Sequence, residues 1–245
     1  MDKYEIEYMT RQEVKERLSA NPVMILPVGS TEQHGFHLPL GTDTILAKAL
    51  AKRTAQKINS LIIPALNYGY SWVWHKIPGT VTLEQEHFKI ILKDIVKSVE
   101  EYGTKVLVII NGHDSNNHSI KYAVRELKYE SNIKILYFFY PKFSSIYEKY
   151  CESKIENGLF HAEEFETSLM LAENESLVDM SKAVKEYPEY TPLYSYSNEI
   201  LGDISKSGVF GDATLASKIK GEKMFDEFTA EISQLIEYAL DNLEK

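Results

Sequence analysis

Four side chains of the types that bind metal ions lie close together in the N-terminal part of the sequence: Glu32, His34, His37 and Asp43. They follow an apolar run over residues 23–28, which predicts a strand that leads into a polar loop. In extended backbone, residues two positions apart point to the same side, so Glu32 and His34 can reach one centre. A polar loop would explain any one of these residues alone, but two carboxylates and two histidines together favour a metal site.

Asp43 lies at the start of a predicted helix. The apolar spacing over residues 44–51 is helical, and Thr42 is expected to cap the helix N-terminus. The positive end of the helix dipole favours a carboxylate at this position. Asp43 is therefore suited to bridge two cations, although an ordinary capping aspartate is the simpler alternative.

Two later junctions carry further ligand types. An apolar strand over residues 105–110 runs into a polar loop that contains His113. Farther along, a loop beginning at His161 enters a helix that contains Glu163, Glu164 and Glu166. The carboxyl ends of parallel strands share one edge of a sheet, so these junctions can converge although they are far apart in sequence.

The segments between these junctions alternate between strand and helix patterns. Strands are predicted over residues 23–28, 61–66, 105–110 and 133–140. Helices are predicted over residues 11–21, 44–58, 83–102, 119–129, 213–220 and 223–243, with shorter ones through Tyr150 and after His161. Thr10 and Glu13 form a capping box for the first helix, and Thr82 is expected to cap the third. The alternation predicts one domain over residues 1–245, with a mostly parallel sheet covered on both faces.

The composition excludes several classes of function. The chain has 245 residues, 44% of them hydrophobic, and a formal net charge of -9. This charge, and the lack of any Lys/Arg cluster, argue against nucleic-acid binding. No apolar stretch approaches the roughly 20 residues of a membrane span, and the sequence starts without an apolar signal segment. The single Cys151 excludes an internal disulfide, so we expect a soluble protein of the reducing cytoplasm.

One segment, residues 187–207, departs from the alternation. It contains two prolines and four tyrosines and has no sustained hydrophobic period. It is either a loop that packs on a neighbouring subunit or a mobile cover.

The sequence resembles the creatininase (creatinine amidohydrolase) family in five segments. They are Gly-Ser-Thr-Glu-Gln-His-Gly-x-His-Leu-Pro-Leu-x-Thr-Asp at residues 29–43, Pro-Gly-Thr at 78–80, Asn-Gly-His-x-x-Asn at 111–116, His-Ala-x-Glu-x-Glu-Thr-Ser at 161–168 and Gly-Val-x-Gly-Asp at 208–212. They occur in the family's order, and the first is too long to arise by chance.

The resemblance implies a three-layer α/β/α sandwich with a mostly parallel central sheet. It also implies two divalent metal ions per chain (Zn²⁺, Mn²⁺ or Fe²⁺), a small-molecule substrate and a homo-oligomer, which in the family is a hexamer. By position, Glu32 and His113 resemble ligands of one metal, His34 a ligand of the other, and Asp43 the bridge.

Two residues compete by position for the role of fifth ligand. The family's common His-Ala-Gly-Glu pattern points to Glu164, with Glu166 as the alternative. This chain departs from that pattern at Glu163, where the family has Gly. Creatininases proper instead use a glutamate at the position of Ser115, and they have a tryptophan shortly before the distal histidine, which this chain lacks. Creatinine is therefore expected to be a poor substrate.

His161 is the candidate for proton transfer, because hydrolysis must protonate a leaving nitrogen and a histidine titrates in the right range. Its alternative role is to hydrogen-bond beside the ligands. His37 is interpreted as structural or as a hydrogen-bonding residue behind the ligands, since two metals already have enough ligands. The candidate substrate contacts are Asp114, His75 and Trp74, for which an Asx turn and exposed loop aromatics are the ordinary explanations.

The sequence thus predicts a binuclear metal-dependent amidohydrolase that cleaves a C–N bond of a small cyclic amide, formamide or related substrate with metal-activated water. The alternatives among relatives are a formamide deformylase of flavin biosynthesis, a cyclic-diketone hydrolase and a peptide-trimming peptidase. An alternative of another class is a non-catalytic metal-binding oligomer subunit. An intact His161 beside a full set of ligands counts against that last possibility.

Overall fold

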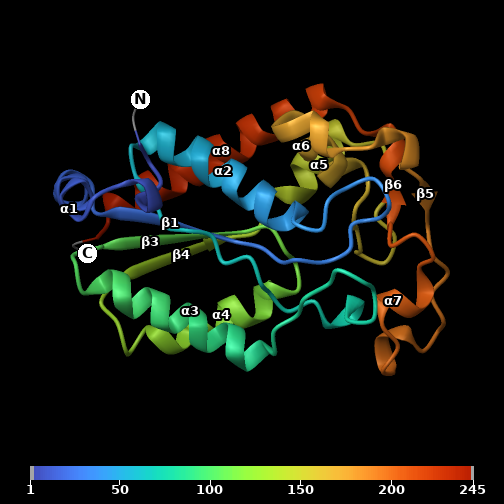
Figure 1. Cartoon of the computed structure of the whole chain (residues 1–245), viewed down its shortest axis with the longest axis horizontal. Coiled ribbons are helices and arrows are strands. Elements are labelled where there is room, and N and C mark those ends of the chain that lie inside the picture. Colours follow the sequence, from blue (N-terminus) through green and yellow to red (C-terminus); the bar gives the residue numbers. More distant parts are fainter. Residues whose placement is uncertain (1–2, 244–245) are drawn as a thin grey trace.

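A four-stranded parallel sheet forms the centre of the computed structural model, which describes residues 3–243 (Figure 1). The strand order is β2-β1-β3-β4, with β1 at Val23–Val28, β2 at Leu61–Ile62, β3 at Val106–Asn111 and β4 at Lys134–Phe138. In the register, Ile25 of β1 lies between Ile62 of β2 and Val108 of β3. Every residue of β1 and β3 is buried, as expected for parallel strands with both faces covered.

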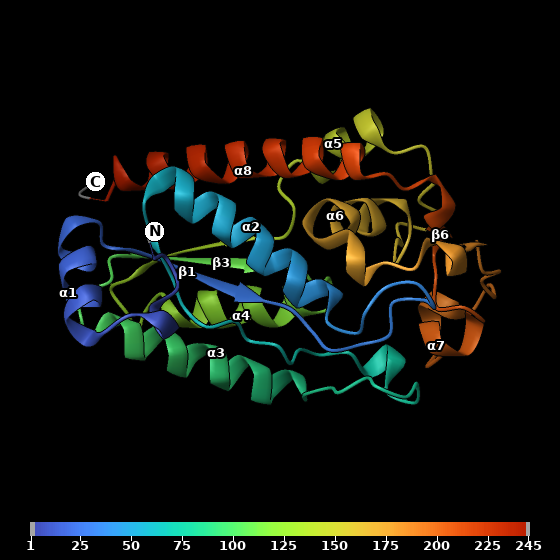
Figure 2. The same cartoon turned by 45° about the horizontal axis from the view of Figure 1, so that its top comes forward.

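Helices cover both faces of the sheet (Figures 1 and 2). One face carries α2 (Thr42–Ile58), α5 (Phe143–Tyr150), α6 (Glu164–Asn174) and α8 (Lys218–Leu240), and the other carries α3 (Gln85–Glu100) and α4 (Asn116–Leu127). Side chains of β1 alternate between the two cores: Val23 and Ile25 pack with α2, α6 and α8, whereas Met24 and Leu26 pack with α3 and α4. The predicted three-layer architecture is confirmed.

The order in which strands are added to the sheet switches from one side of β1 to the other. β2 pairs with one edge of β1, and the next strand, β3, pairs with the other edge. The connecting helices accordingly lie on opposite faces, α2 on one and α3 on the other. Parallel α/β proteins bind ligands outside the carboxyl ends of the strands at such a switch point. The loops that carry Glu32, His34 and His113 begin there.

Two helix N-termini differ from the sequence prediction. The N-cap of α2 is Gly41, and Thr42 lies inside the helix with its hydroxyl donating to the Pro39 carbonyl oxygen at 2.7 Å. The N-cap of α3 is Glu84, because the Thr82 hydroxyl instead accepts a hydrogen bond from the Ser71 amide at 2.8 Å. In both cases another hydrogen bond uses the hydroxyl that the sequence suggested as a cap, within the same turn for Thr42 and to a separate loop for Thr82. The capping box of Thr10 and Glu13 on α1 (Arg11–Ala20) is confirmed.

The C-terminal helix is continuous, although two helices were predicted around Gly221. A Cβ atom at Gly221 would collide with the backbone carbonyl of Ser168, so the glycine marks a close crossing of α8 over α6 and not a break. Strand β2 is shorter than predicted and stops at Ile62, two residues before Pro64, which lacks the backbone N–H that a ladder needs.

The remaining elements are short. β5 (Lys185–Glu186) pairs antiparallel with β6 (Gly211–Asp212), and α7 (Leu201–Ile204) lies in the connection between them. Short 3₁₀ helices occur at Ile6–Tyr8, Trp72–Trp74, Glu175–Leu177, Met180–Lys182, Tyr194–Tyr196 and Ala213–Leu215. Within residues 3–243, none of the helices is long and apolar enough to cross a membrane.

Candidate metal centre

The loop after β1 buries Glu32 and His34 at the switch point. The Glu32 amide donates to the Leu40 carbonyl oxygen at 3.0 Å, which closes the loop. His34 Nδ1 lies 3.2 Å from the Glu32 carbonyl oxygen, an acceptor only, so Nδ1 carries a proton and Nε2 is the nitrogen that faces Asp43. Metal-binding histidines commonly use their second ring nitrogen in this way.

His113 reaches the same point from the end of β3. Its Nε2–H donates to the Tyr70 carbonyl oxygen at 2.8 Å, which leaves Nδ1 free. Nδ1 lies 3.0 Å from Asp43 Oδ2 and 3.4 Å from Glu32 Oε1. A Cβ atom at Gly112 would collide with the backbone carbonyl of Asp43, so this glycine lets the end of β3 lie directly against the first turn of α2.

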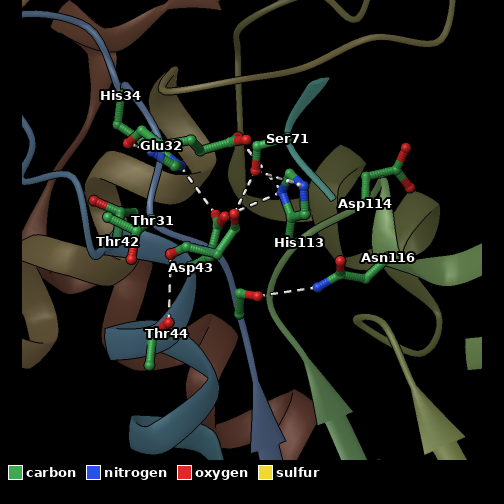
Figure 3. Close-up of polar contacts among 12 residues, drawn as sticks. Thr31, Glu32, His34, Thr42, Asp43, Thr44, Ser71, His113, Asp114 and Asn116 are labelled. Carbon is green, nitrogen blue, oxygen red and sulfur yellow. Dashed lines mark hydrogen bonds and ion pairs between the residues drawn. The ribbon is translucent and has the colours of Figure 1, made fainter. Parts of the chain in front are cut away.

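The Asp43 carboxylate lies between the two histidines (Figure 3). Its Oδ1 is 3.0 Å from His34 Nε2, and its Oδ2 is 3.0 Å from His113 Nδ1. Within residues 3–243, three buried atoms of this cluster have no aligned hydrogen-bond partner: Glu32 Oε2, His34 Nε2 and Asp43 Oδ2. Lone pairs that face one another at this distance repel unless a proton or a cation lies between them.

Glu166 supplies the third carboxylate of the cluster. Its Oε2 lies 4.0 Å from His34 Nε2 and accepts a hydrogen bond from the Ala162 amide at 2.6 Å. Ligand atoms of Glu166, His34 and Asp43 all lie within 4.8 Å of one another. These three residues could therefore hold a cation on the side of Asp43 that faces away from His113.

Glu164, the first choice from the sequence, lies outside the cluster. Its carboxylate accepts hydrogen bonds from the amides of Glu152 and Ser153 at 2.7 and 2.6 Å and forms an ion pair with the partly buried Lys220. It therefore ties the start of α6 to α8. The structure brings the alternative, Glu166, to the centre and leaves Glu164 with a structural pairing.

Burial and the neighbouring charges set the protonation of the cluster. Burial lowers the pKa of His34, but the charge and hydrogen bond of Asp43 together with the charges of Glu166 and Glu32 outweigh it and raise that pKa to about 9. Burial is likewise outweighed at His113, where Glu32 and Asp43 raise the pKa to about 10. Burial raises the pKa of Glu32 and of Glu166 to about 7. Asp43 is also buried, yet its two histidine neighbours hold its pKa well below the usual range.

His161 lies at the edge of the cluster. Its Nε2–H donates to the Gln33 carbonyl oxygen at 2.9 Å, so Nδ1 is free, and Nδ1 lies 3.8 Å from Glu32 Oε1. Burial, with the nearby charge of His34, lowers the pKa of His161 to about 3, so its ring is neutral at pH 7. Ligand atoms of Glu32, His34 and His161 also lie within 4.8 Å of one another, so this histidine is within reach of a cation as well.

The predicted substrate contacts lie in three different settings. Asp114 is exposed, accepts a hydrogen bond from the Asn117 side chain at 2.9 Å and is directed away from the cluster in Figure 3. His75 stacks on Trp72, with ring centroids 4.5 Å apart. Only Trp74 reaches the centre, and it does so by stacking on His161 and not by lining an open pocket.

Two other residues lie near the centre, one of which the sequence identified and one of which it did not. His37 is buried, with Nε2 2.9 Å from the Thr167 hydroxyl, in keeping with the structural role assigned to it. Ser71 was missed: its hydroxyl contacts that of Ser30 and lies 3.4 Å from His113 Nε2. A serine in an aromatic loop carries no signal of its own, and only the spatial meeting of the loops after β1, β2 and β3 reveals it.

Comparisons with known proteins agree with the motifs. The sequence profile described as "Creatininase: Creatinine amidohydrolase" matches residues 7–236. A creatinine amidohydrolase from Pseudomonas putida is 32% identical over 234 residues, covering 89% of this chain and 90% of the relative. A mycofactocin precursor peptide peptidase from Mycobacterium ulcerans (strain Agy99) is 30% identical over 217 residues, covering 84% and 81%.

The fold comparison leads to the same family. A solved structure of a creatininase variant, described as the Zn-Zn type, is similar to this chain with a TM-score of 0.86 and 29% identity, and the match covers 100% of both chains. The sequence profile, the relatives and the fold agree, and this chain belongs to the creatininase family of amidohydrolases.

Proposed function

We propose that this protein uses two divalent metal ions to hydrolyse a C–N bond of a small amide. Glu32 and His113 would hold one ion, His34 and Glu166 the other, and Asp43 would bridge them. One observation carries the proposal: the two oxygens of a single buried carboxylate each lie 3.0 Å from a different histidine. Five ligand residues exceed what one tetrahedral ion with an open position uses.

The charges of the cluster fit cations. Three carboxylates, those of Glu32, Asp43 and Glu166, are almost completely buried together. Burying several ionised carboxylates without compensation is very costly, and two divalent cations would provide that compensation. Imidazole and carboxylate ligands suit Zn²⁺, Mn²⁺ and Fe²⁺. When bound, such ions polarise a carbonyl and lower the pKa of water to about 7.

His161 has the geometry to move the proton that hydrolysis requires. The Gln33 carbonyl oxygen holds the proton on Nε2, so Nδ1 is the basic atom, and it faces the cluster beside Glu32. A proton accepted at Nδ1 can then be delivered to the departing nitrogen.

Metal content tests the ligand assignment. The purified protein, loaded with Zn²⁺ or Mn²⁺ and desalted, should hold close to two ions per chain by elemental analysis. Asp43→Ala should hold one or none, because it removes the shared carboxylate. Glu164→Gln is the matched control, a buried carboxyl on the same helix that lies outside the cluster, and it should keep both ions. Retention of two ions in Asp43→Ala would refute the bridge.

Turnover tests the activity and narrows the substrate. The metal-loaded protein should hydrolyse at least one member of a panel of lactams, formamides and short peptides, and Asp43→Ala should hydrolyse none. Short peptides belong in the panel because one relative is a peptide peptidase. A protein that holds two ions yet acts on no class of C–N bond would instead favour the non-catalytic metal-binding alternative.

A further inference from the structure

Trp74 is buried against His161. Its side chain is 2% exposed, and its ring stacks on the imidazole with centroids 5.1 Å apart and planes inclined by 24°. Trp72, two residues earlier, is 42% exposed and stacks on His75. The two tryptophans of the chain therefore form two separate pairs with histidines, one inside the protein and one at its surface.

We propose that Trp74 is a positioning residue, which fixes the plane of the His161 imidazole so that Nδ1 faces the metal cluster. The inference rests on the proposed function of His161 in proton transfer. It replaces the expectation that Trp74 contacts the substrate, because a side chain with so little exposed surface has no face to offer a ligand.

The hydrogen bonds of His161 leave its ring some freedom to rotate. Its backbone is fixed by the bridge to Phe210, with N to O distances of 3.3 and 2.9 Å, and Nε2 is fixed by the Gln33 carbonyl oxygen. The Cβ–Cγ axis passes between Cε1 and Nε2, so rotation about it displaces Nδ1, which lies farther from the axis, more than it displaces Nε2. The corresponding χ2 torsion of histidine is intrinsically broad. Two rings restrict this freedom: the His34 imidazole packs on His161 at a tilt of 42° with centroids 4.4 Å apart, and the more nearly parallel Trp74 ring stacks on it.

The structure also shows what holds Trp74 in place. Phe210 packs against it edge-on, with ring centroids 6.0 Å apart. Helix α7 packs against Val73 and Trp74. A Cβ atom at Gly202 of this helix would be 2.8 Å from the Val73 carbonyl oxygen and 3.5 Å from Trp74 Cε3. Asp203 of α7 also lies 4.0 Å from the Lys76 ammonium group. Helix α7 therefore supports the turn that carries Trp74.

The base of the segment that contains α7 is closed by one carboxylate. Glu186 accepts hydrogen bonds from the amides of Lys206 and Ser207, both at 2.8 Å, and from the Ser205 hydroxyl at 3.0 Å. These contacts hold the two ends of residues 187–205 together. The segment whose role the sequence left open thus serves as a support behind the aromatic side of the centre.

A spectroscopic experiment tests the stacking without any substrate. Protein labelled with 5-fluorotryptophan should give two ¹⁹F NMR signals, which Trp72→Phe assigns. His161→Gln should shift the Trp74 signal and leave that of Trp72 in place, whereas the matched control His75→Gln should do the reverse. A Trp74 signal that ignores His161→Gln would overturn the stacking.

Kinetics test the positioning role on whichever substrate the panel identifies. Trp74→Leu removes the flat ring and should lower kcat by up to about 10²-fold, the cost of a misplaced catalytic group, with KM and metal content unchanged. Trp74→Phe keeps a flat ring and should restore most of the rate. A raised KM with unchanged kcat would make Trp74 a substrate contact. If both variants lose kcat equally and also lose thermal stability equally, Trp74 contributes packing alone. If no substrate is found, the proposed function fails, and the NMR experiment still decides the stacking.

Discussion

Metal loading should release protons from the cluster, and the number follows from its pKa values. Without cations, His34 and His113 have pKa values raised to about 9 and about 10, so both rings are almost fully protonated at pH 7. Glu32 and Glu166, with pKa values of about 7, are each partly protonated. Because ligands bind in their deprotonated forms, loading at pH 7 should release about two protons from the histidines and about one more from the carboxyls.

The same pKa values set how strongly the protons compete with the metal. Displacing a proton at pH 7 costs about 3 kcal/mol when the pKa is about 9 and about 4 kcal/mol when it is about 10. Both pKa values are raised, so the protons are bound below them and the competition weakens as the pH increases. The apparent affinity for each ion should therefore rise about tenfold per pH unit for each proton displaced, up to about pH 9.

Isothermal titration calorimetry with Mn²⁺ measures both quantities. Titrations at pH 6, 7 and 8, each in two buffers of different ionisation enthalpy, give the number of protons released per ion. His161→Gln is the control, because His161 has a pKa of about 3 and carries no proton on Nδ1 to lose at these pH values. Release of fewer than one proton per chain at pH 7, or an affinity independent of pH, would refute the protonation derived from this geometry.

Three further outcomes are expected. Glu166→Gln should lower the metal content toward one ion per chain, whereas Glu164→Gln should keep both ions but lower Tm, since losing its charged hydrogen bond to the partly buried Lys220 costs about 1.5–3 kcal/mol; elemental analysis and thermal melts check this, and the opposite pattern would restore Glu164 as the ligand. His161→Ala should retain both ions while kcat falls by about 10²–10⁴, and loss of an ion in this variant would make His161 a ligand instead. Creatinine should be turned over with a kcat below about 10 s⁻¹, and a higher value in a steady-state assay would contradict the inference from Ser115 and the missing tryptophan.

Much of the centre could be predicted because its spacing is local. Glu32 and His34 follow a fully apolar strand at a separation of two, so extended backbone alone places them on one side. His113 could be added because β1 and β3 are both buried parallel strands, whose ends must meet at one edge. Ser71 and the stacking of Trp74 could not be predicted, because they depend on how a long loop folds back over that edge.

The choice between Glu164 and Glu166 shows where local reasoning ends. Two residues separated by two positions in a helix point in nearly opposite directions, about 200° apart around the axis, so only one of them can face the cluster. A helix usually reveals its inward face through a polar outer face, but every residue of α6 from Glu164 to Leu171 is buried. The sequence of α6 therefore contains no information about its rotation.

The rotation of α6 is set by a helix that comes much later in the chain. Lys220 of α8, 56 positions after Glu164, pairs with that carboxylate. It can do so because Gly221 beside it lets α8 approach the Ser168 backbone, where any side chain would collide. With Glu164 held on the α8 side, Glu166 has to face His34 and Asp43. The placement of Glu166, the proposed fifth ligand, is thus a consequence of helix packing, and a substitution that enlarges Gly221 should disturb the proposed metal centre although Gly221 lies outside it.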